Sequence, residues 1–322
     1  MSKVKNPRFK LLPYTKIDCL SILDAQQKSG WGITAFDLPN AWKFSQGENV
    51  KIAVLDTGVD RDHPDLKDNL LEGINFINRT KPPEDDNGHG THVTGILVAA
   101  NNEIGMVGVC PKAQVVPVKV LDRNGAGGLQ PVVDGIRWAV DYGVDFIQMS
   151  LGTPSKVQSV RKAIQYAASR GVVTFCAAGN AGNTAEIFYP ANYPETIAIG
   201  AIKESFERAD FSNTGQNLDF MAPGADIFST FPDNWYATLS GTSMACPFAV
   251  GVAALVLSYV KAGKADIKLG SVEAYINLFR NYTTPITSET LADPVFYQGL
   301  GIIDPRKLMD LTLPPAIPPV VP

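Results

Sequence analysis

The chain has few cysteines, and their spacing argues against a small fold held together by zinc. Its 322 residues hold four, Cys19, Cys110, Cys176 and Cys246, with no CxxC pair and no Cys/His cluster at zinc spacing. A zinc-stapled fold is therefore not predicted. The even number permits disulfides, but three of the four lie in apolar segments, where free thiols act as small core residues. A reducing compartment is the better prediction.

Three further absences exclude membrane and nucleic-acid partners. The N-terminus, MSKVKNPRFKLLPYTKIDCL, intersperses Lys and Arg among its apolar residues and lacks the continuous apolar segment of a secretory signal. The longest apolar run, Met244 to Leu257, has fourteen residues, short of the roughly 18 that a membrane span needs, and predicts a buried helix. The net charge of -4 argues against a surface that binds polyanions. We predict a cytoplasmic protein.

The composition is that of a globular protein, with 45% hydrophobic and 19% charged residues. No low-complexity linker interrupts residues 31 to 304, and no internal repeat occurs. We therefore expect one main domain over residues 26–312. Residues 1–25 form a separate N-terminal leader without clear periodicity, and LPPAIPPVVP, residues 313–322, forms a Pro-rich tail that favours polyproline II or disorder.

Short apolar strings alternate with helical patterns along the central part of the chain. The strings are rich in β-branched residues and cover residues 51–56, 113–121, 144–150, 171–178 and 196–202. Between two of them, one helical face carries Leu129, Val132, Val133, Ile136 and Val140. Continuous rather than alternating hydrophobicity indicates strands that are covered on both faces. We predict an α/β fold of three layers, a mostly parallel central sheet with helices on both faces, and a site at the carboxyl ends of its strands.

Four polar residues lie directly before or after these apolar elements, where side chains can form a site. Asp56 ends the first strand, and a carboxylate there is either a strand-end cap or an orienting group. His89 and His92 lie three apart, but no third ligand follows nearby, so a zinc site is weakly supported. His89, flanked by glycines, is the better catalytic base, whereas His92 is expected in the core. Ser243, in SGTSMACPFAVG, is either a helix cap or a nucleophile.

These residues can form a nucleophilic site if the chain brings them together. A hydroxyl is a poor nucleophile until a base takes its proton. His89 can act as that base for Ser243, and Asp56 can hold the imidazole tautomer and stabilise the imidazolium. Asn180, in CAAGN after a buried strand, can donate its amide to the developing oxyanion.

The segments AVLDTGVD, HGTHVTG, AAGN and SGTSMACP resemble the signatures of the subtilase family of serine proteases, in the order Asp, His, Ser. The resemblance spans Trp31 to Asp304 and implies a subtilisin-like fold. It also implies a serine endopeptidase of broad specificity that forms an acyl-enzyme on Ser243. The alternative is a catalytically idle peptide-binding protein. An esterase of the α/β-hydrolase type would need GxSxG and the order Ser, Asp, His, which are absent.

The same resemblance implies how a substrate is held. RNGAGG and MSLGT would be two edges that pair with an extended peptide, and the first specificity pocket would be apolar, without a charged residue. The substrate-binding residues implied are Gly125, Ala126, Gly127, Ser150, Leu151, Gly152, Ala177, Gly179 and Phe188. Glu84, Asp85 and Asp86 either favour basic neighbours in the substrate or form a solvated acidic loop. Phe248 stands where the family usually has His, which we expect to change packing more than chemistry.

Calcium is implied at two places by the resemblance, and oxygen ligands of this kind suit calcium rather than zinc. The strong site would use side chains of Gln27, Asp65 and Asn102 and carbonyls of Ala100, Ile104 and Met106. A weaker site would use Ala191, Tyr193, Thr196 and Asp219, although Asp65 and Asp219 can each be ordinary turn or strand-end residues.

The segment RFKLLPYTK, residues 8–16, resembles the short leader of intracellular subtilisins, which occupies the substrate groove in an unproductive pose. Leu11, Leu12 and Tyr14 would fill subsites, and Pro13 would break the hydrogen-bond ladder because it lacks an amide hydrogen. Without the resemblance, a flexible basic tail is the simpler interpretation. We expect cleavage between Tyr14 and Gln27, which would free the groove and complete the calcium site. A homodimer is typical of the subfamily.

Overall fold

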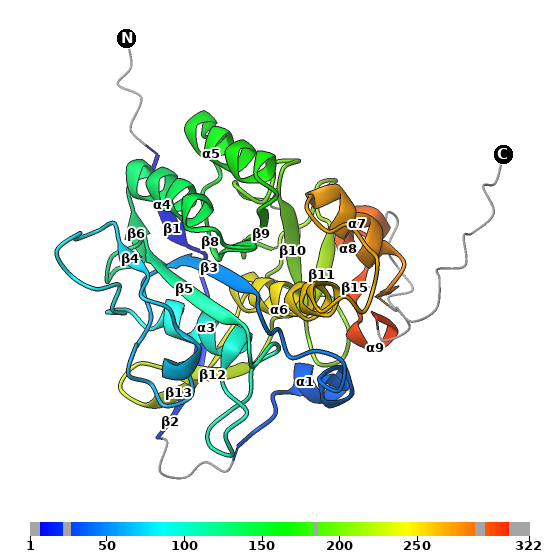
Figure 1. The fold of residues 1–322 in the computed structure, drawn as a ribbon. Helices are drawn as coiled ribbons and strands as arrows, with labels where there is room; N and C mark the ends of the chain where they lie inside the picture. The colour runs from blue at the N-terminus through cyan, green and yellow to red at the C-terminus, as the bar shows by residue number, and fades with distance from the viewer. Residues whose placement is uncertain (1–6, 22–26, 183–185, 287–293, 309–322) are drawn as a thin grey trace.

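The structure is a computed structural model that describes residues 7–21, 27–182, 186–286 and 294–308. Its centre is a nine-stranded sheet (Figure 1). In spatial order the strands are β14 (Thr283–Thr284), β15 (Ile302–Ile303), β11 (Phe220–Pro223), β10 (Ile197–Ile202), β9 (Val173–Ala177), β7 (Phe146–Met149), β3 (Lys51–Asp56), β5 (Gln114–Lys119) and β4 (Ile74–Asn75). All pairs in it are parallel except β14 with β15. The mostly parallel sheet predicted from the sequence is confirmed.

Helices cover both faces of this sheet and complete three layers. Helices α4 (Leu129–Tyr142) and α5 (Gln158–Ser169) pack against each other, as do α3 (His89–Val98) and α6 (Thr242–Lys261). Figure 1 shows the two pairs on opposite sides of the strands. On α4, the buried residues include Val132, Val133, Ile136 and Val140, so the predicted apolar face is the one that packs on the sheet.

The remaining helices are short or lie toward the C-terminus. They are α1 (Trp31–Ala35), α2 (Leu38–Ala41), the 3₁₀ turn Lys67–Asn69, α7 (Val272–Arg280), α8 (Pro294–Gln298) and α9 (Pro305–Leu308). Tyr275 of α7 packs edge-on against Phe146 and Phe175 of the sheet. The predicted Pro-rich tail, residues 313–322, lies outside the described residues.

Helix α6 is the apolar helix that the sequence predicts as buried. By length and composition it could cross a membrane, but 89% of its apolar stretch is buried inside the protein. It packs on β7, β9, β10 and β11, which explains why it is apolar all round. It is therefore a core helix, and it begins at Thr242, one residue before Ser243.

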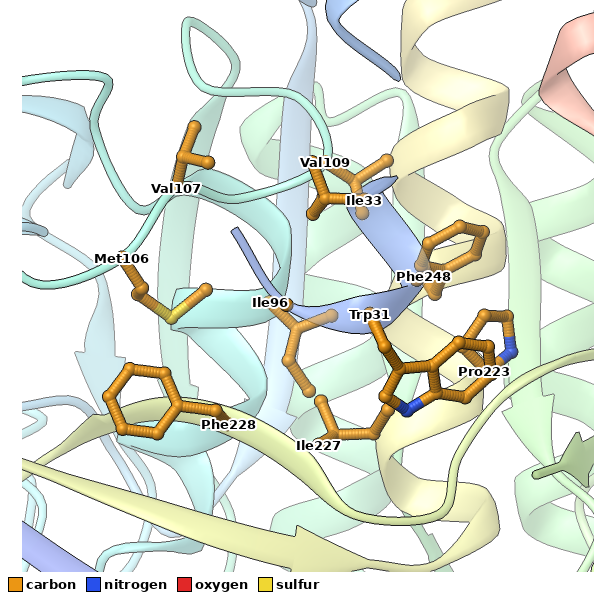
Figure 2. Close-up of a pocket in the computed structure, with 12 residues that line it drawn as sticks. Trp31, Ile33, Ile96, Met106, Val107, Val109, Pro223, Ile227, Phe228 and Phe248 are labelled. Atoms are coloured by element: carbon orange, nitrogen blue, oxygen red, sulfur yellow. The ribbon is translucent and has the colours of Figure 1, made fainter. Parts of the chain in front are cut away.

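Phe248 of α6 is buried, with a ring contact to Phe36. Figure 2 shows it with Trp31 and Pro223 around an apolar pocket. The cavity volume there is about 30 Å³, which is room for one or two water molecules at roughly 10 to 15 Å³ each. The pocket is a packing gap and too small for a substrate side chain. The expectation that Phe248 acts through packing agrees with this position.

Two small sheets contain the two strands formed by residues 9–21. In the first, β1 (Phe9–Leu11) lies between β6 (Ala126–Gly127) and β8 (Leu151–Gly152). In the second, β2 (Thr15–Ser21) pairs with β13 (Trp235–Ser240), which also pairs with β12 (Ile227–Phe231). The periodicity of residues 1–25 does not predict these strands, because their extended form depends on pairing with β6, β8 and β13.

Candidate active site

The acid and the base lie at the ends of two neighbouring core elements. Asp56 is the last residue of β3 and His89 the first of α3, and neither side chain is exposed to solvent. The Nδ1 of His89 lies 2.9 Å from Oδ1 of Asp56, which also accepts the amide of Thr57 at 2.7 Å. With Nδ1–H donating to the carboxylate, Nε2 keeps its lone pair. That atom has no hydrogen-bond partner within the described part of the chain, so it is the free basic site.

Asp85 supports the turn that presents His89. Its Oδ1 accepts the hydroxyl of Thr57 at 2.8 Å and the amide of Gly88 at 3.0 Å, and its Oδ2 accepts the amide of Thr91 at 2.9 Å. A carboxylate at the start of a helix satisfies amides that have no partner within the helix. The sequence analysis did not assign this role, although an acidic residue four positions before the helix start is a usable signal.

The other two acidic residues of this loop are also engaged within the protein. Asp86 pairs with the buried Lys119 at 2.6 Å, and Lys119 also donates to the carbonyl of Thr57. Glu84 accepts the amide of Arg61 at 3.3 Å. Asp85 and Asp86 therefore hold the loop that carries the base rather than standing free toward a substrate.

Ser243 is the second residue of α6, and its side chain does not cap the helix. The N-cap is Gly241, which excludes the helix-cap role that the sequence left open for Ser243. The Oγ of Ser243 donates to the carbonyl of Ser150 at 3.3 Å. In this structure the hydroxyl is turned toward β8 and away from a bond with His89.

The carbonyl of Ser243 also accepts a hydrogen bond from Ser150, because helix α6 lacks the amide that would normally donate to it. Pro247 lies one turn further along α6 and has no N–H to donate to that carbonyl. The hydroxyl of Ser150 donates to it instead at 2.8 Å. The nucleophile's backbone is thereby tied to the edge where MSLGT lies.

Asn180 is oriented by the residue before the nucleophile. Its Oδ1 accepts both the amide of Thr242 at 2.9 Å and the hydroxyl of Thr242 at 2.7 Å. Because the oxygen is occupied, the Nδ2 group faces the groove and donates to the carbonyl of Pro13 at 2.7 Å. The structure thus brings Asn180 beside the start of α6, in the orientation of an oxyanion donor. Thr242 was not singled out from the sequence.

The two edges expected for substrate binding are occupied by the leader. Lys10 pairs with Ala126 on one side and with Gly152 on the other, both antiparallel. The amide of Leu11 donates to the carbonyl of Gly125 at 2.9 Å.

The side chain of Leu12 is almost fully buried, at 1% exposure. A Cβ placed on Gly152 would lie 3.2 Å from Leu12 and 3.3 Å from Phe188, and one on Gly179 would lie 3.3 Å from Phe188. Leu12 is therefore buried against Gly152, which the sequence assigned to the first specificity pocket together with Ser150, Leu151, Ala177, Gly179 and Phe188.

His92 has a core position, as expected. Its Nε2 lies 3.1 Å from the carbonyl of Ile227 and 3.0 Å from that of Ala237. Burial lowers the pKa of His92 to about 3, so the ring is neutral near pH 7. Within the described residues, no group of three or more His, Cys, Asp or Glu side chains is placed to hold a metal ion.

The residues of the strong calcium prediction do meet in space. Asp65 is buried and accepts the amide nitrogen of Asn102 at 3.0 Å and the backbone amide of Met106 at 3.0 Å. The side chain of Gln27 lies 2.8 Å from the carbonyl of Ala100. Tyr236, which the sequence analysis missed, donates to Asp65 at 2.8 Å. Carbonyl and carboxylate oxygens with reorientable amides form a donor set that fits calcium.

The loop of residues 102–106 packs closely against Asp65 and Tyr236. The amide of Ile104 lies 3.3 Å from Oδ1 of Asn102. Gly105 has a φ of +53°, and a Cβ there would lie 1.8 Å from the Tyr236 hydroxyl and 2.3 Å from the Asp65 carboxylate. Only glycine therefore allows the backbone to approach these oxygens so closely.

The residues of the weak calcium prediction have other partners. The hydroxyl of Thr196 lies 3.1 Å from the carbonyl of Ala191 and 2.9 Å from that of Tyr193. Asp219 accepts the amide of Ala198 at 2.8 Å, and burial raises its pKa to about 7. The Thr196 hydroxyl proton already meets the loop carbonyls, and the Asp219 carboxylate already accepts a backbone amide, so this donor set fits a cation poorly.

A buried carboxylate–imidazole pair, a serine at a helix start and an amide aimed into the same groove define a serine hydrolase that works by acyl transfer. Residues 47–276 match the profile of the Subtilase family, so the chain belongs to this family and is a serine endopeptidase.

The chain is similar to the major intracellular serine protease of Bacillus subtilis (strain 168), with 40% identity over 297 residues, 89% of this chain and 92% of that protein. An intracellular serine protease of Paenibacillus polymyxa is 41% identical over 263 residues, 79% of this chain and 80% of that protein. Subtilisin E of Bacillus subtilis is 47% identical over 216 residues, and the match covers 66% of this chain but 56% of that protein.

Proposed function

We propose that the chain is an intracellular endopeptidase of broad specificity, made as a zymogen whose own N-terminal leader fills the substrate groove. The observation that carries the proposal is the path of the leader. Strand β1 lies between β6 and β8, and the carbonyl of Pro13 meets Asn180. A segment held as an added strand is recognised through its backbone. Substrates held on the same edges would be selected weakly by sequence.

The chemistry follows from the positions of the side chains. Ser243 turns from Ser150 toward His89, and Nε2 takes its proton as Oγ attacks the carbonyl carbon. Asp56 stabilises the imidazolium, and Asn180 donates to the oxyanion of the tetrahedral intermediate. His89 then gives the proton to the leaving nitrogen as the C–N bond breaks. Water, activated by the same imidazole, attacks the acyl-enzyme and returns Ser243 to its hydroxyl form.

The leader escapes cleavage because its backbone is out of register with the site. In a productive complex, the residue whose side chain fills the specificity pocket also supplies the carbonyl in the oxyanion hole. Here Leu12 lies in the pocket, whereas the carbonyl on Asn180 belongs to Pro13. Pro13 has no amide to continue the ladder. The ring of Tyr14 lies 5.2 Å from that of His89 and covers the base.

The predicted location and partners fit this function. The cysteines whose side chains are described, Cys110, Cys176 and Cys246, are buried and free, as in a reducing compartment. The relatives at about 40% identity are named intracellular. We propose a cytoplasmic enzyme that acts on protein and peptide substrates and forms a homodimer, without nucleic-acid or membrane partners.

Calcium at the cluster around Asp65 belongs to the same proposal. Gln27 follows directly on residues 22–26, which lie outside the described residues, and its amide nitrogen now meets the carbonyl of Ala100. Turning that amide would present its oxygen to a cation, as would turning Asn102. A bound calcium would cross-link the start of the domain to the loop of residues 100–106 and stabilise the fold.

Chelation should therefore lower the melting temperature. We expect EDTA to reduce Tm by roughly 4 °C relative to saturating calcium, because a ligand at about 100 times its Kd stabilises by about 2.7 kcal/mol. Scanning calorimetry measures the shift. Asn102→Ala should remove most of it, and Asp219→Asn should retain it. A Tm that is indifferent to calcium in the wild-type protein would contradict the calcium proposal.

Deleting residues 1–18 should raise the initial rate of casein hydrolysis at least about tenfold, because a tethered inhibitor acts at an effective concentration near millimolar. The full chain should start slowly, accelerate, and lose its leader between Tyr14 and Gln27, as mass spectrometry would reveal. A fluorophosphonate should label Ser243 faster in the truncated protein.

Point variants separate this inhibition from a general effect of the N-terminus. Leu12→Asp should shorten the lag, since it places a charge in a buried apolar position. Lys10→Ala changes an exposed side chain two residues earlier in the leader and should leave the lag unchanged. The proposal fails if the truncated, folded protein shows an unchanged or lower initial rate.

A further inference from the structure

The leader continues past the catalytic residues along a second edge of the protein. Strand β2 pairs antiparallel with β13, with Thr15 opposite Ser240 and Lys16 opposite Leu239. Ser240 lies three residues before Ser243. Counted from the Pro13 carbonyl on Asn180, Lys16 is the third residue. This edge therefore receives the part of a peptide that follows the scissile bond.

One side chain of β12 contacts the leader at that third position. The ammonium of Lys16 lies over the ring of Phe231, 4.0 Å from its centroid. A cation on an aromatic face at this distance is attracted by the ring quadrupole. Lys16 is exposed and Phe231 half-buried, so the ring presents its face to the groove.

The position of Phe231 is fixed from behind by the turn that carries the base. A Cβ on Gly88 would lie 2.3 Å from the Phe231 ring, so the ring packs directly on the residue before His89. Near the tip of the hairpin, a carboxylate oxygen of Asp60 accepts the amide of Asp233 at 3.0 Å. A rigid aromatic face beside acidic groups is suited to a cationic side chain.

We propose that Phe231 is a specificity-determining residue that selects Lys or Arg at the third position after the scissile bond. The substrate would lie as a strand on β13, in the place of β2, and its third side chain would cover the ring as Lys16 does. This inference rests on the proposed function, since it takes the leader's path after the Pro13 carbonyl as the path of a substrate. The displacement of Leu12 lies before that carbonyl and does not change the count.

Internally quenched peptides test the preference. They share one sequence and differ only at the third position after the cleaved bond, which carries Lys, Arg, Met or Glu. With the full-length protein incubated until its activity is constant, kcat/KM for Lys should exceed that for Met about threefold, the size of an exposed cation–π contact. Lys moved to the second or fourth position should show no such gain.

Two variants test whether the preference for Lys depends on the Phe231 ring. Phe231→Leu should bring the Lys-to-Met ratio close to one. Phe228→Leu, on the same strand, should keep the wild-type ratio. Equal cleavage of the Lys and Met peptides by the wild-type protein would overturn the proposal, and so would a preference that survives Phe231→Leu.

Hydrogen exchange tests the contact between Lys16 and Phe231 without relying on catalysis. In full-length Ser243→Ala, we expect Lys16→Met and Phe231→Leu each to speed hydrogen exchange of the amides of residues 15–21 about threefold. The double variant should be no faster than either single one, because both remove the same contact. Additive effects, or none, overturn the inference. If exchange behaves as expected but no peptide is cut, the proposed function fails while the contact stands.

Discussion

Replacing Asp56 with alanine lowers kcat for peptide hydrolysis by roughly 10⁴-fold, on the expectation that the carboxylate holds the imidazole in its working tautomer. Its Oδ1 is the acceptor for Nδ1 of His89, and neither group reaches solvent. Without it, the Nδ1 proton loses its partner and the imidazolium loses a countercharge at the moment it forms. Since substrate contacts lie elsewhere, KM should change little.

The measurement uses proteins that lack residues 1–18, because a weak enzyme cannot remove its own leader. Asp134→Ala is the matched control, as that carboxylate lies on the surface of α4 and pairs with the exposed Arg79. It should keep kcat within about twofold, as surface pairs contribute little. An Asp56→Ala protein that is folded by circular dichroism and loses less than tenfold in kcat would show that the pair is structural.

Asn180→Ala should lower kcat by roughly 10² to 10³, or about 3 to 4 kcal/mol of transition-state stabilisation. The side-chain oxygen of Asn180 accepts two hydrogen bonds from Thr242, and the nitrogen donates to the carbonyl of Pro13. The donor is therefore already in place when the oxyanion forms. Stopped assays over a range of substrate concentrations separate kcat from KM.

A loss that falls mainly on KM would instead mean that Asn180 only binds the ground state. Asn277→Ala, an exposed residue on α7, serves as the control and should match the parent enzyme. Both variants again lack residues 1–18, since Asn180 also contacts the leader.

The core strands could be predicted from the sequence because burial on both faces leaves a plain pattern. The string at residues 51–56 is β3 to the residue, and the string at 171–178 contains β9. Strands β1 and β2 could not be predicted from residues 8–21 by periodicity. Their extended form comes from the unpaired edges of β6, β8 and β13, which lie far away in the sequence.

The chemistry-bearing residues were found through motifs, whereas their supports were not. Asp56, His89 and Asn180 stand in recognisable segments. Asp85 and Thr242 act only through hydrogen bonds that exist once loops and helix ends have met. The offset between the Leu12 side chain and the Pro13 carbonyl is likewise a property of three-dimensional register, for which local sequence carries no signal.

The covalent link between β1 and the groove it fills has a consequence for how such an enzyme is controlled. A separate inhibitor dissociates when its concentration in the cell falls. A blocking strand on the same polypeptide keeps a constant local concentration beside its target. Dilution alone would therefore not activate the proposed zymogen. Only a cut in the chain would release the groove, and that cut is irreversible.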